Sequence, residues 1–95
     1  MAFELELPPA LAARRWKVKI RDREGPEEPH VSIINRTRTW RFGLRSRGFL
    51  DSSPPPNEVP KALLDHIQAN AELLRGEWDR MYPANPVAGT EDDDA

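Results

Sequence analysis

An apolar stripe at helical spacing runs through residues 59–82 and constrains the fold more than any other feature of the chain. At 100° per residue its members fall within about 60° of one line, whereas Lys61, Glu72 and Asp79 lie opposite. Asn57 is the expected N-cap, and Pro83 ends the helix. The stripe predicts one long amphipathic helix with a buried face of Pro60, Leu63, Leu64, Ile67, Ala71, Leu74, Trp78, Met81 and Tyr82.

Three segments ahead of this helix, residues 16–21, 30–34 and 39–45, alternate apolar and polar side chains with period two. Residues 48–50 predict a short fourth extended piece, and residues 35–38 a hairpin connection in which Asn35 tolerates a positive φ. The expected inward-facing set is Trp16, Val18, Ile20, Val31, Ile33, Trp40, Phe42 and Leu44. The predicted fold class is therefore α+β: a small antiparallel sheet of three to four strands, packed on one face by a long C-terminal amphipathic helix.

The length of 95 residues allows one domain. We expect an N-terminal arm over residues 1–13 that packs loosely, a βββα domain over residues 14–83, and a disordered acidic tail over residues 84–95. The absence of cysteine excludes disulfides and thiolate metal sites. The acidic N-terminus resembles neither a signal peptide nor a membrane anchor, which predicts a cytoplasmic protein that does not bind membranes.

Charge is separated along the chain, although the net charge is only −2. Residues 14–47 carry eleven Lys and Arg against four acids, whereas residues 48–95 carry three bases against ten acids. Such separation indicates directional association with a charged partner. The alternative is that the basic half faces the acidic half of its own fold, or of a second copy in a homo-oligomer.

The basic residues gather on the outward face of the predicted sheet and at its edges. Ser32 and Ile34 join them from the middle strand, and no aromatic side chain is expected on this face to stack on bases. A partner protein is the first hypothesis, and non-sequence-specific binding of nucleic acid through the same face is the alternative. The candidate binding residues are Lys17, Lys19, Arg21, Arg36, Arg38, Arg41, Arg45 and Arg47.

The outer surface of the helix is a second candidate contact. Leu73 lies about 120° from the stripe and should be exposed. Gly76 lies opposite the core, where it costs about 1 kcal/mol relative to Ala. Together with Ala62 and Ala69, Gly76 leaves a smooth outer surface that another backbone could approach; the alternative is drift at a tolerant surface position.

The residues show no spacing that is typical of a catalytic or cofactor site. His30 and His66 are the only histidines, and we expect the first to bind a loop carbonyl and the second to lie at the surface. No serine lies in an elbow motif, and no glycine-rich phosphate loop is present. The prediction is no enzyme, no metal and no cofactor; a metal-dependent or nucleolytic activity based on His30 is the third hypothesis.

Three segments resemble the DUF4160 family of small bacterial proteins. They are Glu-Pro-His-Val-Ser-Ile at 28–33, Trp-Arg-Phe-Gly-Leu at 40–44 and the helix end Asn-Ala-Glu-Leu-Leu-Arg-Gly-Glu-Trp at 70–78. The sequence departs from the family at Ser32, where a second histidine is common. The resemblance implies a toxin–antitoxin or defence-system accessory protein, often encoded beside a small partner. We therefore expect an interaction module that binds a partner protein through its basic sheet face.

Overall fold

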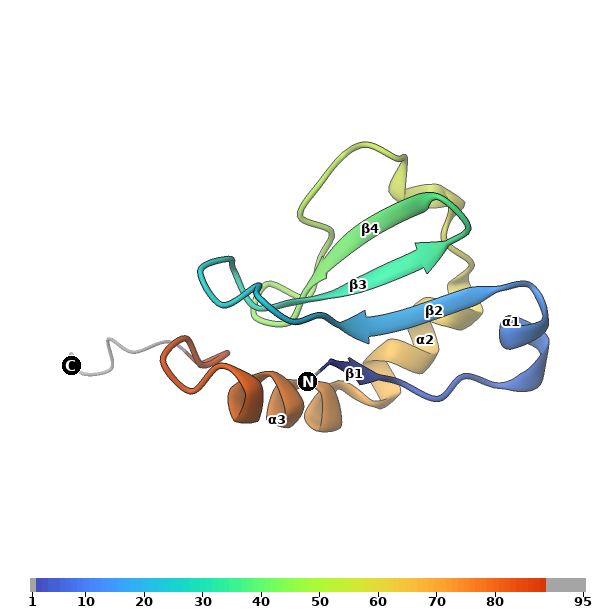
Figure 1. Ribbon diagram of the computed structural model, residues 1–95. Coiled ribbons are helices and arrows are strands. Elements are labelled where there is room, and N and C mark those ends of the chain that lie inside the picture. The colour runs from blue at the N-terminus through green and yellow to red at the C-terminus, as the bar shows by residue number, and fades with distance from the viewer. Residues whose placement is uncertain (1, 89–95) are drawn as a thin grey trace.

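The computed structural model describes residues 2–88 and contains a four-stranded antiparallel sheet in the order β1-β2-β3-β4 (Figure 1). The strands are β1 (Phe3–Glu4), β2 (Trp16–Ile20), β3 (His30–Asn35) and β4 (Arg38–Gly43). The helices are α1 (Pro9–Ala13), α2 (Lys61–Ala69) and α3 (Ala71–Met81), and a 3-10 turn, η1 (Pro56–Glu58), precedes α2. The expected α+β class with an antiparallel sheet is confirmed.

The register of β2, β3 and β4 follows from the alternation in the sequence. Val18 pairs with Ile33, and Ile33 pairs with Trp40, so these three side chains form one buried row across the sheet. Trp16, expected in the same inward set, is only half-buried. Ser32, expected on the wet face, is 1% exposed because it lies between the longer side chains of its cross-strand neighbours.

The fourth strand is not the segment that the sequence predicted. Phe3 and Glu4 pair with the end of β2, whereas in residues 48–50 Phe49 forms only an isolated bridge to Phe42. The predicted loose arm over residues 1–13 thus contributes an edge strand, and Leu5 and Leu11 lie in the core. A two-residue strand has no periodicity to read, which explains why the sequence did not reveal it.

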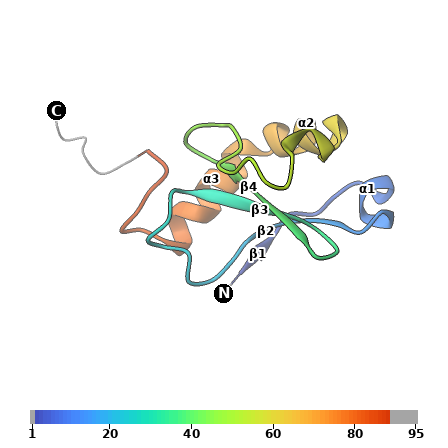
Figure 2. The same cartoon turned by 90° about the horizontal axis from the view of Figure 1, so that it is seen from above.

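The expected single helix over residues 59–82 is two helices, separated at Asn70. Asn70 has φ −109° and ψ 20°, and its Nδ2 donates to the carbonyl of His66 at 2.8 Å. The backbone amide of Asn70 donates to the same carbonyl at 3.2 Å. Asparagine favours helix ends because its side chain bonds to nearby backbone groups outside regular helical geometry. Figures 1 and 2 show the change of direction between α2 and α3.

The start of α2 also differs from the prediction. Pro60 is its N-cap, and Asn57, the expected cap, lies inside η1. Val59 is extended, with φ −82° and ψ 125°, because the residue before a proline avoids helical angles. The helix therefore begins only after Pro60.

One hydrophobic cluster joins both helices to the strands. It contains Leu63 and Ile67 from α2 and Leu74 and Trp78 from α3, each at most 1% exposed. The predicted disordered tail over residues 84–95 is wrong for its first part, because Val87 is buried in the same cluster and Asn85 is hydrogen-bonded to the β2–β3 loop. Residues 89–95 of that prediction lie outside the described residues. No helix within residues 2–88 is both long and apolar enough to span a bilayer.

Candidate functional site

Three of the predicted binding residues satisfy charges or carbonyls of the protein itself. Arg41 donates two hydrogen bonds to Asp51, of 2.8 and 2.7 Å, and one to Glu27, of 3.2 Å. Arg38 is ion-paired with Glu58 and lies 5.1 Å from the ring centroid of Trp40. These contacts account for part of the charge separation, since acids from both halves of the chain neutralise two of the basic side chains.

Arg45 is the third such residue. Its Nε donates to the carbonyl of Val87 at 2.7 Å, and its Nη2 donates to that of Pro86 at 3.0 Å. A guanidinium suits this task because it presents several donors in one plane. Arg45 therefore holds the segment after α3 against the end of β4.

The ion pair between Arg41 and Asp51 shifts the pKa values of both side chains. The hydrogen bonds from Arg41, followed by its charge, hold the pKa of Asp51 below its usual range, although burial acts in the opposite direction. The same bonds raise the pKa of Arg41 further above its ordinary value. Bidentate pairs of this kind are the surface ion pairs that contribute measurably to stability.

A second group of cations has no such partners. Arg15, Lys17 and Arg36 are exposed, and no ion pair or hydrogen bond engages their side chains within residues 2–88. They line an open hollow of about 520 Å³, together with Ala12 and Ile34. We call these five residues the cationic hollow. Figure 1 shows α1 and the β3–β4 turn, which contribute to it, at the same end of the sheet.

Local backbone geometry presents two of these cations. Arg15 follows α1 with φ 70°, and Arg36 lies in the β3–β4 turn with φ 59°. The sequence suggested a positive φ at Asn35, but in the structure Arg36 is the residue of this turn with a positive φ. Glycine or asparagine adopts this conformation at lower cost than arginine, so backbone preference alone does not favour arginine here.

The structure brings Lys17 and Arg36 together and leaves the other predicted residues outside the hollow. Lys19 is half-buried on β2, Arg21 is exposed at the start of the next loop, and Arg47 lies beyond β4 with φ 61°. Arg15 was missed by sequence reasoning. Its position directly after a short apolar helix is the available signal, but the sequence predicts a loosely packed arm over residues 1–13.

The predicted contact on the outer helix surface is exposed. Leu73 is 47% exposed and borders a groove of about 630 Å³ against the N-terminal segment. A Cβ built on Gly76 would meet no atom within 4 Å, so this side of α3 is open. Both residues therefore lie where the sequence placed them.

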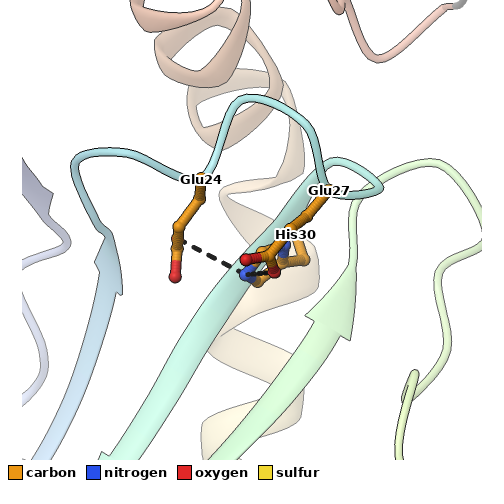
Figure 3. Close-up of side chains that lie close together, drawn as sticks. All are labelled: Glu24, Glu27 and His30. Atoms are coloured by element: carbon orange, nitrogen blue, oxygen red, sulfur yellow. Dashed lines mark ion pairs between the residues drawn. The ribbon is translucent and has the colours of Figure 1, made fainter.

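A third cluster combines His30 with two glutamates of the β2–β3 loop (Figure 3). His30 opens β3 and is fully buried, and its Nδ1 lies 2.7 Å from the carbonyl oxygen of Glu28, as expected of a loop carbonyl. Its Nε2 lies 3.4 Å from Oε1 of Glu24 and 3.8 Å from Oε1 of Glu27. We call these three residues the His30 cluster. Sequence reasoning missed this cluster, because Glu24 and Glu27 lie in a loop, where spacing along the chain does not indicate which side chains come together.

The segment after α3 fixes the loop that carries these glutamates. Nδ2 of Asn85 donates to the carbonyls of Gly25 and Glu27, each at 2.7 Å. The hydroxyl of Tyr82 accepts from the amide of Glu24 at 3.0 Å and donates to the carbonyl of Arg21. The other histidine, His66, is half-buried, and its Nε2 lies 2.8 Å from the carbonyl oxygen of Glu6.

No family model, curated protein or solved structure matches this chain, so the resemblance to the DUF4160 family stays a prediction that rests on the three quoted segments.

Proposed function

We propose that this protein is an interaction module that binds an acidic segment of a partner protein in the cationic hollow. The observation that carries the proposal is the convergence of Arg15, Lys17 and Arg36, which are exposed and unpaired in the described part of the chain. Exposed cations without internal partners can form ion pairs with a ligand without first breaking any. Following the resemblance, the partner belongs to a toxin–antitoxin or defence system and is encoded nearby.

The chemistry of the hollow suits a peptide carboxylate. Ile34 and Ala12 add an apolar surface between the three cations, so an acidic residue and an adjacent apolar one could both be accommodated. Arginine binds a carboxylate through two parallel hydrogen bonds, which also fixes the orientation of the ligand. Cationic complementarity of this kind accelerates association and selects against basic partners.

Some basic residues of the sheet are already engaged by the protein itself, and this supports the cationic hollow as the binding site over the rest of the sheet. Arg38, Arg41 and Arg45 would each have to give up internal contacts in order to bind a ligand. We infer that α2 and α3 form an amphipathic layer on the opposite face of the sheet, which leaves the face of Lys17 and Ile34 to the partner. The predicted contact set therefore narrows to Lys17 and Arg36, and Arg15 joins it.

Non-specific binding of nucleic acid is the competing function of the same hollow. No ring lies among the hollow residues on which a base could stack, so any such binding would go through phosphates. Neutralising three phosphates on a single strand gives a slope of about −2 in a plot of log K against log salt. A flat or absent response to a single-stranded oligonucleotide would favour the protein partner.

The test uses fluorescence anisotropy with a labelled oligo-glutamate peptide and a labelled single-stranded oligonucleotide. The hollow variant replaces Arg15, Lys17 and Arg36 by Ser. The control variant also introduces three serines, in place of Lys61, Arg80 and Arg23, which lie outside the hollow. It therefore changes the net charge by the same amount. We expect the hollow variant to lose about tenfold or more in affinity for the peptide and the control to stay within about twofold, where tenfold corresponds to about 1.4 kcal/mol.

Two outcomes would contradict the proposal. Equal losses in both variants would mean that net charge, and not the hollow, attracts the peptide. Preference for the oligonucleotide with the steep salt slope would assign the hollow to nucleic acid instead. Circular dichroism of both variants checks that the fold is retained.

A further inference from the structure

The His30 cluster contains a buried nitrogen that makes no hydrogen bond in the described chain, although two carboxylates lie within 4 Å of it. His30 is fully buried, and its Nε2 has no hydrogen-bond partner within residues 2–88. The short contact from Nδ1 to the carbonyl of Glu28 requires that Nδ1 carry a proton, since a carbonyl oxygen only accepts. In the neutral ring this leaves a lone pair on Nε2, directed at the two glutamates (Figure 3).

This arrangement is the one that metal-binding histidines adopt. Such a histidine donates its other ring nitrogen to a carbonyl or carboxylate, which fixes the tautomer and the orientation of the ring. Glu28 provides that carbonyl, and Trp78 packs against the ring with 5.6 Å between the centroids. The imidazole is thus held in place before any ligand arrives.

The distances fit a small divalent ion. Zinc bonds of about 2.0–2.2 Å to nitrogen and oxygen place neighbouring ligand atoms of a tetrahedron about 3.4 Å apart. The distance from Nε2 to Glu24 is 3.4 Å, that to Glu27 is 3.8 Å, and all three ligand atoms lie within 4.8 Å of one another. Rotation of the Glu24 and Glu27 side chains would bring their oxygens to this spacing and complete three corners of the site.

The surroundings leave the fourth corner open. The side chain of Glu24 is 13% exposed and that of Glu27 is 42% exposed, so the cluster is closed at His30 and open to solvent at Glu27. Glu27 is shared with Arg41, but Arg41 keeps both of its hydrogen bonds to Asp51 if Glu27 turns to a metal. Asn85 and Tyr82 hold the loop backbone, so the order of this loop does not depend on the ion.

We propose that His30, Glu24 and Glu27 bind one divalent transition-metal ion of the Zn²⁺ class, with one coordination position left for water or a ligand. One imidazole and two carboxylates suit Zn²⁺ better than Mg²⁺, which requires oxygen ligands in an octahedron. The site lies at the opposite end of the sheet from the cationic hollow (Figure 1), so its test is independent of the proposed function.

The test is a titration of the ¹⁵N-labelled full chain, freed of metal by a chelator, with Zn²⁺ in excess Mg²⁺. The chain has only two histidines and no cysteine, so the ring nitrogens of His30 and His66 can be followed separately by NMR. We expect one equivalent of Zn²⁺ to shift Nε2 of His30 strongly and to leave His66 unchanged. Calorimetry of the same titration gives the affinity.

Glu24→Gln is the decisive variant, because it removes a ligand while keeping the shape of the side chain. We expect it to weaken Zn²⁺ binding at least about tenfold. Glu28→Gln is the matched control: it makes the same change in charge on an exposed side chain of the same loop, and it should bind Zn²⁺ like the parent protein. His30→Ala is avoided, since removing a fully buried ring next to Trp78 endangers the fold.

The possible results divide cleanly. A shift at His30 that is lost in Glu24→Gln and kept in Glu28→Gln supports the site. Absence of a His30 shift, or equal affinity in both variants, overturns it and assigns the His30 cluster to a purely structural ion pair. Binding accompanied by a shift of His66 alone also overturns it.

Discussion

Replacing Arg36 by Gly should stabilise the protein and weaken its binding in one step. Arg36 occupies the first central position of a two-residue turn between β3 and β4, since Asn35 pairs with Arg38 across the turn. It has φ 59°, and Thr37 is not among the residues with positive φ. In hairpins of this form the favoured residue at the first position is glycine.

The magnitude follows from two opposing effects. A left-handed conformation costs a residue with a Cβ about 1–2 kcal/mol, which Gly does not pay. Gly also gives the unfolded chain more freedom, which costs about 0.4–1 kcal/mol of stability. No described contact of the Arg36 side chain is lost, so the free energy of unfolding should rise by about 0.5–1 kcal/mol.

Urea denaturation followed by tryptophan fluorescence measures the change, and the peptide anisotropy assay measures the loss of binding. Thr37→Gly is the control in the same turn: it brings the entropic cost without relief of strain and should destabilise by about 0.4–1 kcal/mol. Destabilisation by Arg36→Gly would refute the reasoning, because it would show that the arginine side chain contributes to the fold. A stable variant with unchanged peptide binding would remove Arg36 from the proposed contact.

Three further changes test the fold and its electrostatics. Leu74→Ala should cost about 2–5 kcal/mol in urea denaturation because the side chain is fully buried in the core, and a cost below about 1 kcal/mol would contradict that packing. Gly76→Ala should raise the free energy of unfolding by about 1 kcal/mol, and with it the thermal midpoint, because alanine favours the helix and its methyl meets no atom. A lowered midpoint would show that this side of α3 is not open. The pKa of Asp51 is lower in the folded protein than its ordinary value of 3.8, so its contribution to stability is present above pH 3.8 and is lost as the pH falls through the folded pKa. Asp51→Asn should therefore flatten the acid limb of a plot of stability against pH, and an unchanged limb would mean that the pair with Arg41 does not contribute.

The sheet was largely readable from the sequence because its central strands obey a single rule. In β2, β3 and β4, one face is buried, and period-two alternation records that burial directly. The C-terminal end of the helical segment was nearly right, whereas its start was wrong because Val59 and Pro60 do not enter the helix. The break at Asn70 was missed because it preserves the apolar face on both sides, so the pattern of hydrophobic residues does not register it.

The candidate sites were less predictable, since they depend on contacts between distant segments. Alternation places Lys17 and Arg41 on the same side of the sheet. Only the fold shows that Asp51 and Glu27 neutralise Arg41, whereas no residue among 2–88 forms an ion pair with Lys17. The His30 cluster likewise depends on a loop that Asn85 holds from far along the chain. Neither relation leaves a periodic signal.

In the proposed function, the partner binds to the three cations that lack ion pairs within residues 2–88, and not to the whole basic face. Titrating the ¹⁵N-labelled protein with oligo-glutamate and following its amide and arginine side-chain signals tests it directly. We predict saturable shifts at Arg15, Lys17 and Arg36, with Arg41 and Arg45 unmoved. Shifts of equal size at Arg41 and Arg45, or shifts spread evenly over all exposed cations, would contradict the claim.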